Sequence, residues 1–267
     1  MGTVRVGLCT GLGALAGEDH PLRPGEADIL VFPELADGGY ARLKSGGEPH
    51  RPGDPLLRQF AAASRTIAPT CIAGSVYYRE GNPLPANTCL VFHRGRVVHR
   101  YDKIHLFRPT GDHLYFRPGS RIRTFRLAAG AVRLRCGVII CYDLRFPELA
   151  RTLTRMGLDV LFVPARWPAA RDDAWQTLLK ARAIENQVFV VGCNARGEEG
   201  GWSYAFDPLG LKIFDGHDAP GDEAHALTLD TERIRAALAL HRTLDEAVVL
   251  RSSALARRVT ARRRRPR

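Results

Sequence analysis

The 267-residue sequence lacks any apolar run of the ~18 residues that a membrane-spanning helix needs. Its first residues, MGTVRVGLCT, lack the basic region and long apolar run of a secretory signal peptide, so we expect a cytoplasmic protein. No CxxC pair occurs among the six cysteines, which stand mostly inside apolar runs. We therefore expect buried, reduced thiols, with neither disulfides nor a metal site. The cysteines are Cys9, Cys71, Cys89, Cys136, Cys141 and Cys193.

Lysine is scarce, and acidic residues are absent from the C-terminal end. Only four of the 39 basic residues are lysines, so arginine supplies most of the positive charge. The last eleven residues, RRVTARRRRPR, hold seven arginines, which leaves +4 of the formal net charge of +11 for residues 1–256. Because this body is only mildly basic, we expect no nucleic-acid partner except through non-specific contacts of the tail. The tail, residues 257–267, is expected to be disordered.

Short apolar runs alternate with Gly- and Pro-rich turns, and no low-complexity linker separates them before the tail. One domain over residues 1–256 is therefore predicted. Most of the apolar runs are continuous, which is typical of sheets covered on both faces in layered α/β proteins. Strands are expected at Val4–Cys9, Asp28–Phe32, Thr70–Tyr78, Thr88–His93, Val97–Tyr101, Val132–Ile140, Asp159–Val163, Val188–Asn194 and Ala224–Leu229.

Three helices are predicted. The first begins at Pro147, where a first-turn proline is tolerated, and ends before Gly157. The second begins with Asp172 and Asp173, whose charges favour the positive end of a helix dipole. The third covers about Thr231–Leu250 and is expected to pack on the outside or to be exchanged with a partner subunit.

The segment GVIICYDLRFPE places a cysteine between a buried strand and a helix. Cys141 ends the apolar run, and the proline-started helix begins six residues later. At such a strand-to-helix elbow, the backbone N–H of Tyr142 can point at a developing oxyanion, and the thiolate is a nucleophile. We therefore interpret Cys141 as a nucleophile, and the other five cysteines as small buried hydrophobic residues.

A nucleophilic thiol needs a proton acceptor, and the sequence offers several candidate residues for this role. Histidine is the usual proton acceptor, and His105 and His113 are candidates, although no pattern shows how either would reach Cys141. In ADILVFPEL a strand runs straight into Glu34, which places a carboxylate at the strand end where sites of α/β sheets are built. Lys103, one of the four lysines, is a compact cation that suits a thiolate and an oxyanion.

The three segments together resemble the nitrilase superfamily of carbon–nitrogen hydrolases, with VFPEL around Glu34, YDKIHLF around Lys103 and GVIICYDLRFPE around Cys141. Their order and separations also fit. The resemblance continues through VPARWPAARDDAWQTLLKARAIENQVFVVGCNARG and GWSYAFDPLG, so that it covers most of residues 4–230. The last segments are most similar to the branch of ω-amidases and related small-amide hydrolases.

The resemblance implies a four-layer α-β-β-α sandwich with a Glu–Lys–Cys triad, no metal or organic cofactor, and a homodimer. It implies Glu34 as general base, Lys103 and the N–H of Tyr142 as the oxyanion site, and Cys141 as the nucleophile of a thioester mechanism. The expected substrate is a small linear amide, most of all the ω-amide of a dicarboxylic or 2-oxo acid. N-carbamoyl amino acids and nitriles are the alternatives, and Tyr142, where nitrilases have tryptophan, favours amides over nitriles.

Two departures from the family pattern concern the substrate site. Family members usually carry a further glutamate after the lysine motif, where this chain has Asp112, one methylene shorter. This acid either supports Lys103 and the substrate amide or is a solvated loop residue. Arg166 replaces a common asparagine and is expected either to grip a substrate carboxylate or to turn outward to solvent. Arg145 is a second candidate for an acidic group, with a structural ion pair as its alternative.

Two other classes of protein compete with this interpretation. VRVGLCTGLGALAG is nearly a dinucleotide-binding fingerprint, but two glycines and two prolines crowd residues 17–25 and leave too little room for the required helix. We therefore expect no dinucleotide cofactor and a stunted first helix. A non-enzymatic protein that binds through its arginine-rich tail is the other alternative, and the presence of all three triad residues argues against it.

Overall fold

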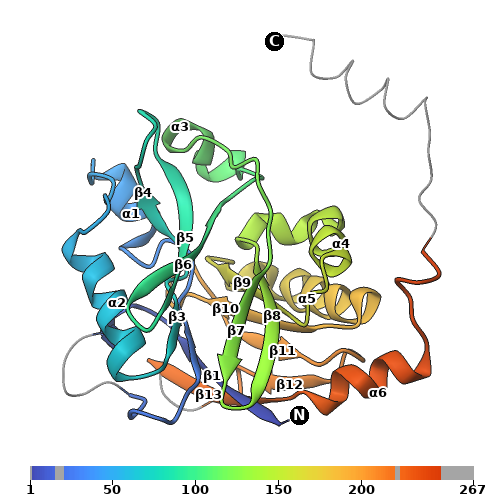
Figure 1. Cartoon of the computed structure of the whole chain (residues 1–267). Coiled ribbons are helices and arrows are strands. Elements are labelled where there is room, and N and C mark those ends of the chain that lie inside the picture. The colour runs from blue at the N-terminus through green and yellow to red at the C-terminus, as the bar shows by residue number, and fades with distance from the viewer. Residues whose placement is uncertain (1, 16–20, 220–222, 248–267) are drawn as a thin grey trace, which may run out of the picture.

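The computed structural model describes residues 2–15, 21–219 and 223–247. Two mixed β-sheets lie face to face at its centre (Figure 1). The seven-stranded sheet has the order β13-β1-β2-β3-β5-β4, with β6 beside β5, and the six-stranded sheet has the order β12-β11-β10-β9-β8-β7. The strands of the first sheet are β1 (Thr3–Cys9), β2 (Ile29–Val31), β3 (Thr70–Ile72), β4 (Val76–Tyr78), β5 (Ala86–His93), β6 (Arg96–Asp102) and β13 (Ala224–Asp230). Those of the second are β7 (Phe125–Ala129), β8 (Val132–Val138), β9 (Val160–Ala165), β10 (Phe189–Asn194), β11 (Tyr204–Phe206) and β12 (Lys212–Asp215).

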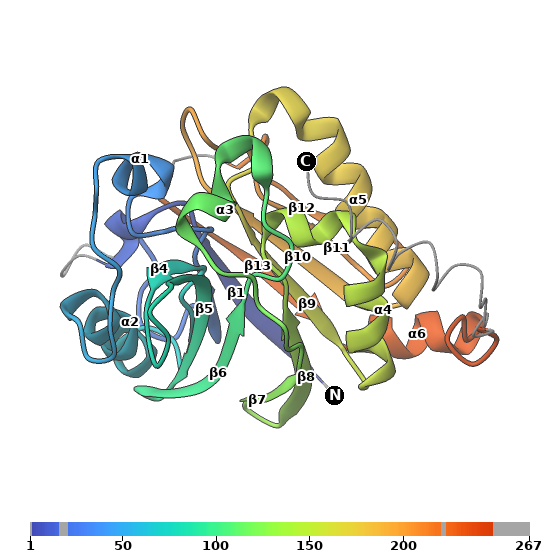
Figure 2. The ribbon, with the colours of Figure 1, turned by 90° about the horizontal axis from the view of Figure 1, so that it is seen from above.

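Helices cover the outer faces of both sheets, as the view from above shows (Figure 2). Helix α2 (Pro55–Thr66) packs on β3 and β5, whereas α5 (Asp172–Asn186) packs on β10 and β11 with α4 (Pro147–Arg155) beside it. The largest hydrophobic cluster joins side chains of both sheets, and a second one joins the seven-stranded sheet to α2. The predicted α-β-β-α sandwich is therefore confirmed. The remaining helices are α1 (Gly39–Lys44), α3 (Asp112–Tyr115) and α6 (Glu232–Leu240).

The central strands are buried on both faces, as their continuous apolar runs predict. Every residue of β2, β9 and β10 is buried. β9 pairs in parallel with both β8 and β10, so that their carboxyl ends meet at one edge of the six-stranded sheet. In the other sheet, β1 pairs in parallel with β2 and antiparallel with β13. The pairing of β1 with β13 brings the N-terminal strand and the last strand of the described chain together. The six cysteines are free and buried, as expected.

Several boundaries differ from the prediction. The strand expected at residues 70–78 is two strands, because Gly74 between them takes φ +61° and a Cβ there would lie 1.9 Å from the carbonyl oxygen of Pro33. The helices α1, α2 and α3 and the strands β7, β11 and β12 were not predicted. The three strands are short or alternate between buried and exposed residues. Between β1 and β2 the described residues form only a short 3₁₀ turn, Leu12–Leu15, in agreement with the expected stunted first helix.

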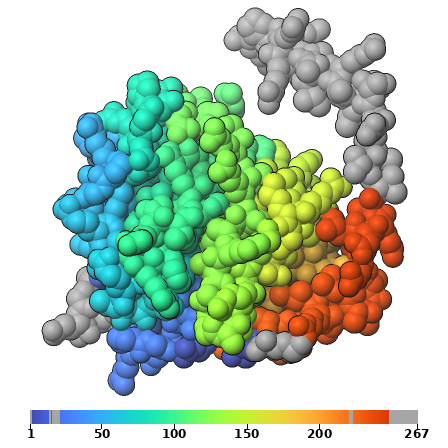
Figure 3. Space-filling model, viewed as in Figure 1, coloured from blue at the N-terminus to red at the C-terminus, as the bar shows by residue number. Residues whose placement is uncertain are grey.

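The C-terminal helix is shorter than predicted. Helix α6 ends at Leu240, since His241 is extended, and it lies at the surface of the molecule (Figure 3). Gln187, which ends α5 in a left-handed conformation, donates from its amide to the carbonyl oxygens of Ala237 (3.0 Å) and His241 (2.8 Å). Exchange of this helix with a partner remains a prediction, and the tail at 257–267 lies outside the described residues. No helix in the described ranges is long and apolar enough to cross a bilayer.

Candidate active site

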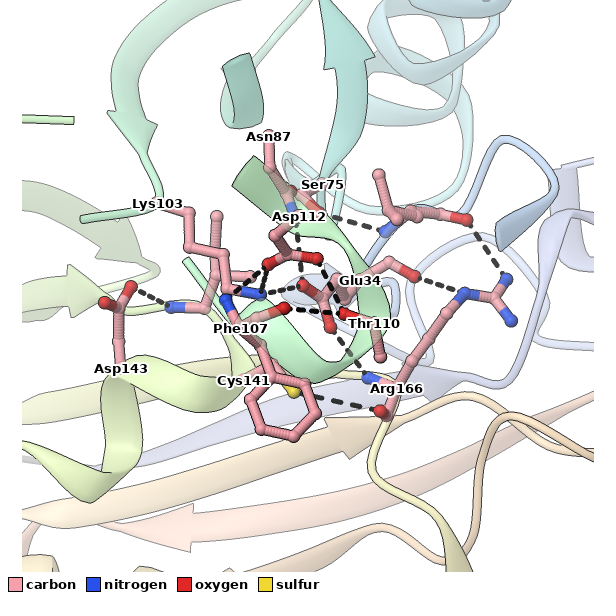
Figure 4. Close-up of polar contacts among 12 residues, drawn as sticks. Glu34, Ser75, Asn87, Lys103, Phe107, Thr110, Asp112, Cys141, Asp143 and Arg166 are labelled. Atoms are coloured by element: carbon pink, nitrogen blue, oxygen red, sulfur yellow. Dashed lines mark hydrogen bonds and ion pairs between the residues drawn. The ribbon is translucent and has the colours of Figure 1, made fainter. Parts of the chain in front are cut away.

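Glu34 stands where the chain leaves β2, at the edge of the seven-stranded sheet. Its side chain is completely buried. Oε1 accepts hydrogen bonds from Nζ of Lys103 (2.7 Å) and from Nδ2 of Asn87 (2.9 Å), and Oε2 accepts one from the backbone N–H of Arg166 (3.1 Å). The carboxylate is thus held by donors from both sheets, and Figure 4 shows it beside Lys103, Asp112 and the sulfur of Cys141.

Lys103 follows the last residue of β6 and is also completely buried. Its ammonium lies between two carboxylates, 2.7 Å from Oε1 of Glu34 and 2.8 Å from Oδ2 of Asp112. Burial alone would lower the pKa of Lys103, but Glu34 and the other nearby acidic groups raise it well above its usual value. The lysine is therefore a fixed positive charge at neutral pH.

Cys141 begins a 3₁₀ turn, Cys141–Arg145, that connects β8 to α4. Its φ of +45° is unusual for a residue with a side chain, and such strain is typical of a nucleophile at a strand-to-helix elbow. The thiol contacts the carbonyl oxygen of Arg166 over 3.8 Å. The N–H of Tyr142 belongs to the first turn of this 3₁₀ helix, where backbone donors have no partner within the helix.

The thiol of Cys141 is held in its protonated form. Burial and the Glu34 carboxylate raise its pKa well above the usual value, and Lys103 only partly offsets them. A protonated thiol next to a carboxylate needs that carboxylate as its base. Neither histidine named by the sequence has a hydrogen bond to Cys141 among the described residues. His105 binds Asp143 and stacks on Phe146, and His113 is an exposed residue of α3.

Asp112 belongs to this buried cluster, so the alternative of a solvated loop aspartate is wrong. The side chain has no exposed surface. Oδ2 accepts from Lys103 and from the backbone N–H of Phe107 (2.9 Å), whereas Oδ1 accepts from the hydroxyls of Tyr40 (2.8 Å) and Thr110 (3.0 Å). Four donors thus surround the two carboxylate oxygens.

Arg166 does not turn outward to solvent, which corrects one of the two expectations for it. Its guanidinium donates to the carbonyl oxygens of Glu34 (2.8 Å) and Leu35 (3.0 Å) and lies 3.4 Å from Glu199. Leu35 takes a φ of +45°, and its N–H is held by the hydroxyl of Ser75. Arg166 therefore holds the turn that carries Glu34, and its donors are largely used for that purpose.

A pocket of about 580 Å³ opens onto Cys141. Arg145 is exposed at its wall, with its guanidinium 4.9 Å from the ring centre of Trp167. Within the described part of the chain, Arg145 has no carboxylate partner, so the structural ion pair considered for it is not found. Other cationic side chains line the same pocket, namely Lys44, Arg108, Arg166 and Arg171, whereas Glu198 and Glu199 supply negative charge.

Sequence reasoning missed Tyr40, Asn87 and Asp143. Tyr40 lines the pocket and Asn87 contacts Glu34, although each lies more than fifty residues from its partner in the cluster. Asp143, two residues after Cys141, is buried and accepts from the N–H of Ile140. Its position inside the cysteine motif was the one available signal. Among the described residues, no three His, Cys, Asp or Glu side chains are grouped so that they could hold a metal ion.

Comparisons with known proteins identify the family of this chain. The carbon–nitrogen hydrolase family matches residues 15–236. The 2-oxoglutaramate amidase of Bacillus subtilis is 35% identical over 195 residues, which are 71% of this chain and 74% of that protein. The ω-amidase YafV of Escherichia coli K12 is 35% identical over 221 residues, 80% of each chain. The structure of XC1258 from Xanthomonas campestris, a CN-hydrolase superfamily protein with an arsenic adduct in its active site, superposes with a TM-score of 0.78 at 24% identity over 95% of this chain and all of that one. The chain therefore belongs to the carbon–nitrogen hydrolase family, as its three motifs predict, and it is a hydrolase of non-peptide carbon–nitrogen bonds.

Proposed function

We propose that the protein is a cysteine-dependent amidohydrolase that releases ammonia from a small linear amide. The observation that carries the proposal is the buried contact of Glu34 with Lys103 beside the sulfur of Cys141, which lines the pocket. A carboxylate, a fixed ammonium and a thiol in one water-poor site are the groups that acyl transfer through a thioester needs.

In the proposed reaction, the sulfur of Cys141 attacks the amide carbon while Glu34 takes the thiol proton. The carbonyl oxygen becomes an oxyanion, which the Lys103 ammonium and the N–H of Tyr142 stabilise. The carbon–nitrogen bond then breaks, and Glu34 returns the proton to the leaving nitrogen, so that ammonia departs and a thioester remains. Glu34 next takes a proton from water, whose oxygen attacks the thioester and releases the carboxylic acid, and the thiol is restored.

For the substrate we propose the ω-amide of a dicarboxylic or 2-oxo acid. The relatives named as a 2-oxoglutaramate amidase and an ω-amidase support this choice. Two guanidiniums of the pocket, those of Arg145 and Arg171, lie over the rings of Trp167 and Phe107 and have no carboxylate partner in the described ranges. A flat guanidinium held in this way is free to bind a carboxylate through two hydrogen bonds. Arg145 is the candidate for this contact.

The test is ammonia release from 2-oxoglutaramate, succinamate, glutamine, an N-carbamoyl amino acid and a simple nitrile, by the wild type and by Cys141→Ala. We expect the two ω-amides to be hydrolysed and the variant to be inactive. Ammonia release that survives the substitution would contradict the mechanism. Preference for the N-carbamoyl compound or the nitrile would keep the nucleophile but overturn the proposed substrate.

We also propose a homodimer, on the basis of the family resemblance. Near the C-terminal end of α5, the large apolar side chains of Ile184, Leu209 and Leu211 are exposed together. Light scattering coupled to gel filtration should report twice the mass of 29.5 kDa. A mass of one chain at micromolar concentration would overturn the proposal.

A further inference from the structure

Tyr40 is the side chain that connects the pocket to the buried cluster. It lines the pocket, and only 6% of its surface is exposed. Its ring packs in a small cluster with Leu43 and Phe116, and its backbone N–H donates to Oε2 of Glu199 over 3.1 Å. Its hydroxyl donates to Oδ1 of Asp112 over 2.8 Å. Both ends of the residue are therefore fixed.

The Tyr40 hydroxyl is a donor to Asp112 and has capacity for a second bond. Burial and the Glu34 carboxylate raise its pKa well above the usual value, so the hydroxyl keeps its proton. Tyr40 lines the same pocket as Cys141, and its hydroxyl and the Lys103 ammonium donate to the two oxygens of the same Asp112 carboxylate. A phenol oxygen that donates one hydrogen bond can still accept another.

Asp112, in contrast, has little capacity left for a substrate. Its two oxygens already accept from Lys103, Phe107, Tyr40 and Thr110. It is fully buried and does not line the pocket. The glutamate usual at this place in the family is one methylene longer than this aspartate. Two of this aspartate's hydrogen-bond donors, Tyr40 and Thr110, line the pocket and bring hydroxyl groups to this side of it.

We propose that Tyr40 contacts the substrate itself: its hydroxyl donates to Asp112 and accepts a hydrogen bond from the N–H of the substrate carboxamide. This inference rests on the proposed function, because it requires an amide substrate at Cys141. The contact orients the amide plane, so that the carbon faces the sulfur and the nitrogen lone pair that develops during cleavage faces Glu34. The Asp112 carboxylate polarises the hydroxyl and makes its oxygen a better acceptor.

The test compares a primary amide with the methyl ester of the same acid. Both substrates acylate Cys141 and form the same thioester, but only the amide has an N–H to offer Tyr40. For Tyr40→Phe we expect kcat/KM of the amide to fall about tenfold or more, and that of the ester to change less than about threefold. The ratio of the two is the decisive quantity, because both substrates report on the same folded molecules. An equal fall in both, or no change in either, would overturn the proposal.

Two further variants separate direct contact from support of the fold. Tyr77→Phe removes the hydroxyl of a ring that packs on Phe116 in the same cluster, and the charged groups that act on Tyr77 are Glu48, Arg79 and Arg42 rather than those of the site. We expect no change with either substrate.

Thr110→Val removes the other hydroxyl near Oδ1 of Asp112, whose single proton is shared between that oxygen (3.0 Å) and the carbonyl oxygen of Phe107 (2.9 Å). Thr110 also lines the pocket. If Tyr40 acted only by positioning Asp112, or if Thr110 held the amide in its place, this variant would lower the amide-to-ester ratio as well, and that result would contradict direct contact by Tyr40. We expect the ratio to stay within about twofold of the wild type. Failure of the proposed function looks different, since the wild type itself would then leave every amide intact.

Discussion

The hydroxyl of Tyr101 donates to Oδ2 of Asp143 over 2.7 Å and so ties β6 to the turn that carries Cys141. The same carboxylate accepts from the backbone N–H groups of His105 (2.8 Å) and Ile140 (3.1 Å). The buried Asp143 side chain therefore fixes the position of the segment that carries Lys103 relative to the turn that carries Cys141.

Asp143→Asn should disturb both segments. An amide nitrogen then replaces one acceptor oxygen and faces a donor, which leaves buried groups without partners. We expect the free energy of unfolding to fall by about 2 kcal/mol and kcat to fall about tenfold or more, with a smaller change in KM. Urea denaturation and steady-state kinetics measure both. Tyr101→Phe removes a single donor, so its cost should be smaller, and an Asp143→Asn enzyme with the wild-type kcat would contradict the positioning role.

Lys103→Met should leave two buried carboxylates without their cation. Glu34 and the other nearby acidic groups raise the pKa of Lys103 well above its usual value, so its ammonium is charged at neutral pH. Loss of one partner from a buried charge cluster costs about 3–5 kcal/mol, and we expect that loss in the free energy of unfolding, together with loss of activity. The exposed Lys180 of α5 provides the control, because Lys180→Met should change neither quantity. Equal stability of the two variants would contradict the charge balance described here.

The positive φ of Cys141 predicts an unusual ranking of two inactive variants. Alanine keeps the strained conformation, whereas glycine adopts it freely. We therefore expect Cys141→Gly to be about 0.5–1 kcal/mol more stable than Cys141→Ala in urea denaturation.

The matched control for this ranking is Cys136, which is buried in β8, where glycine weakens a strand. There the order should reverse, and Cys136→Ala should be the more stable variant. If glycine were the weaker residue at both positions, the backbone of Cys141 would not be the source of strain.

His99 should make the protein sensitive to acid. Burial, with a contribution from Arg123, lowers its pKa from 6.5 to about 4, its ring stacks on Phe125 at 4.6 Å, and its Nε2 has no hydrogen-bond partner among the described residues. The unfolded chain binds a proton at this histidine below pH 6.5, whereas the folded protein does not until about pH 4. The contribution of the neutral His99 to the free energy of unfolding is therefore fully present above pH 6.5 and is lost as the pH falls to about 4.

We expect this contribution to be on the order of 2 kcal/mol across that window. His99→Leu keeps an apolar side chain on Phe125 and cannot titrate, so the gap between its unfolding free energy and that of the wild type should change with pH in this direction. Parallel pH profiles of the two proteins would contradict the assignment.

The positions of Glu34 and Cys141 could be predicted because each follows a strand within a short motif, and strand ends converge at sheet edges. Lys103 was indicated by the scarcity of lysine and by the resemblance of YDKIHLF to a family motif. The hydrogen bonds that surround these residues could not be predicted from the sequence. Tyr40 and Asp112 are 72 residues apart, and Arg166 and Glu34 are 132 apart, so only the packed sheets show that they meet. Arg166 in particular carries a charge that suggests a substrate contact, whereas its donors hold backbone carbonyl oxygens.

The fold, too, could be predicted only in part. Continuous apolar runs identified the central strands, since β2, β9 and β10 are buried throughout. The helix α2 was missed, although Asp54 before Pro55 is an ordinary signal for a helix start. The break at Gly74 depends on the approach of the Pro33 carbonyl group from another strand connection, which no local pattern records.

The site draws its base and its lysine from the edge of one sheet and its nucleophile from the edge of the other. Neither half of the molecule holds a complete set of reacting groups. A partly folded chain in which only one sheet has formed therefore has either Glu34 and Lys103 or Cys141 in place, and it cannot hydrolyse an amide. Recovery of activity during refolding should consequently follow the docking of the two sheets, which makes turnover a reporter of the last step of assembly.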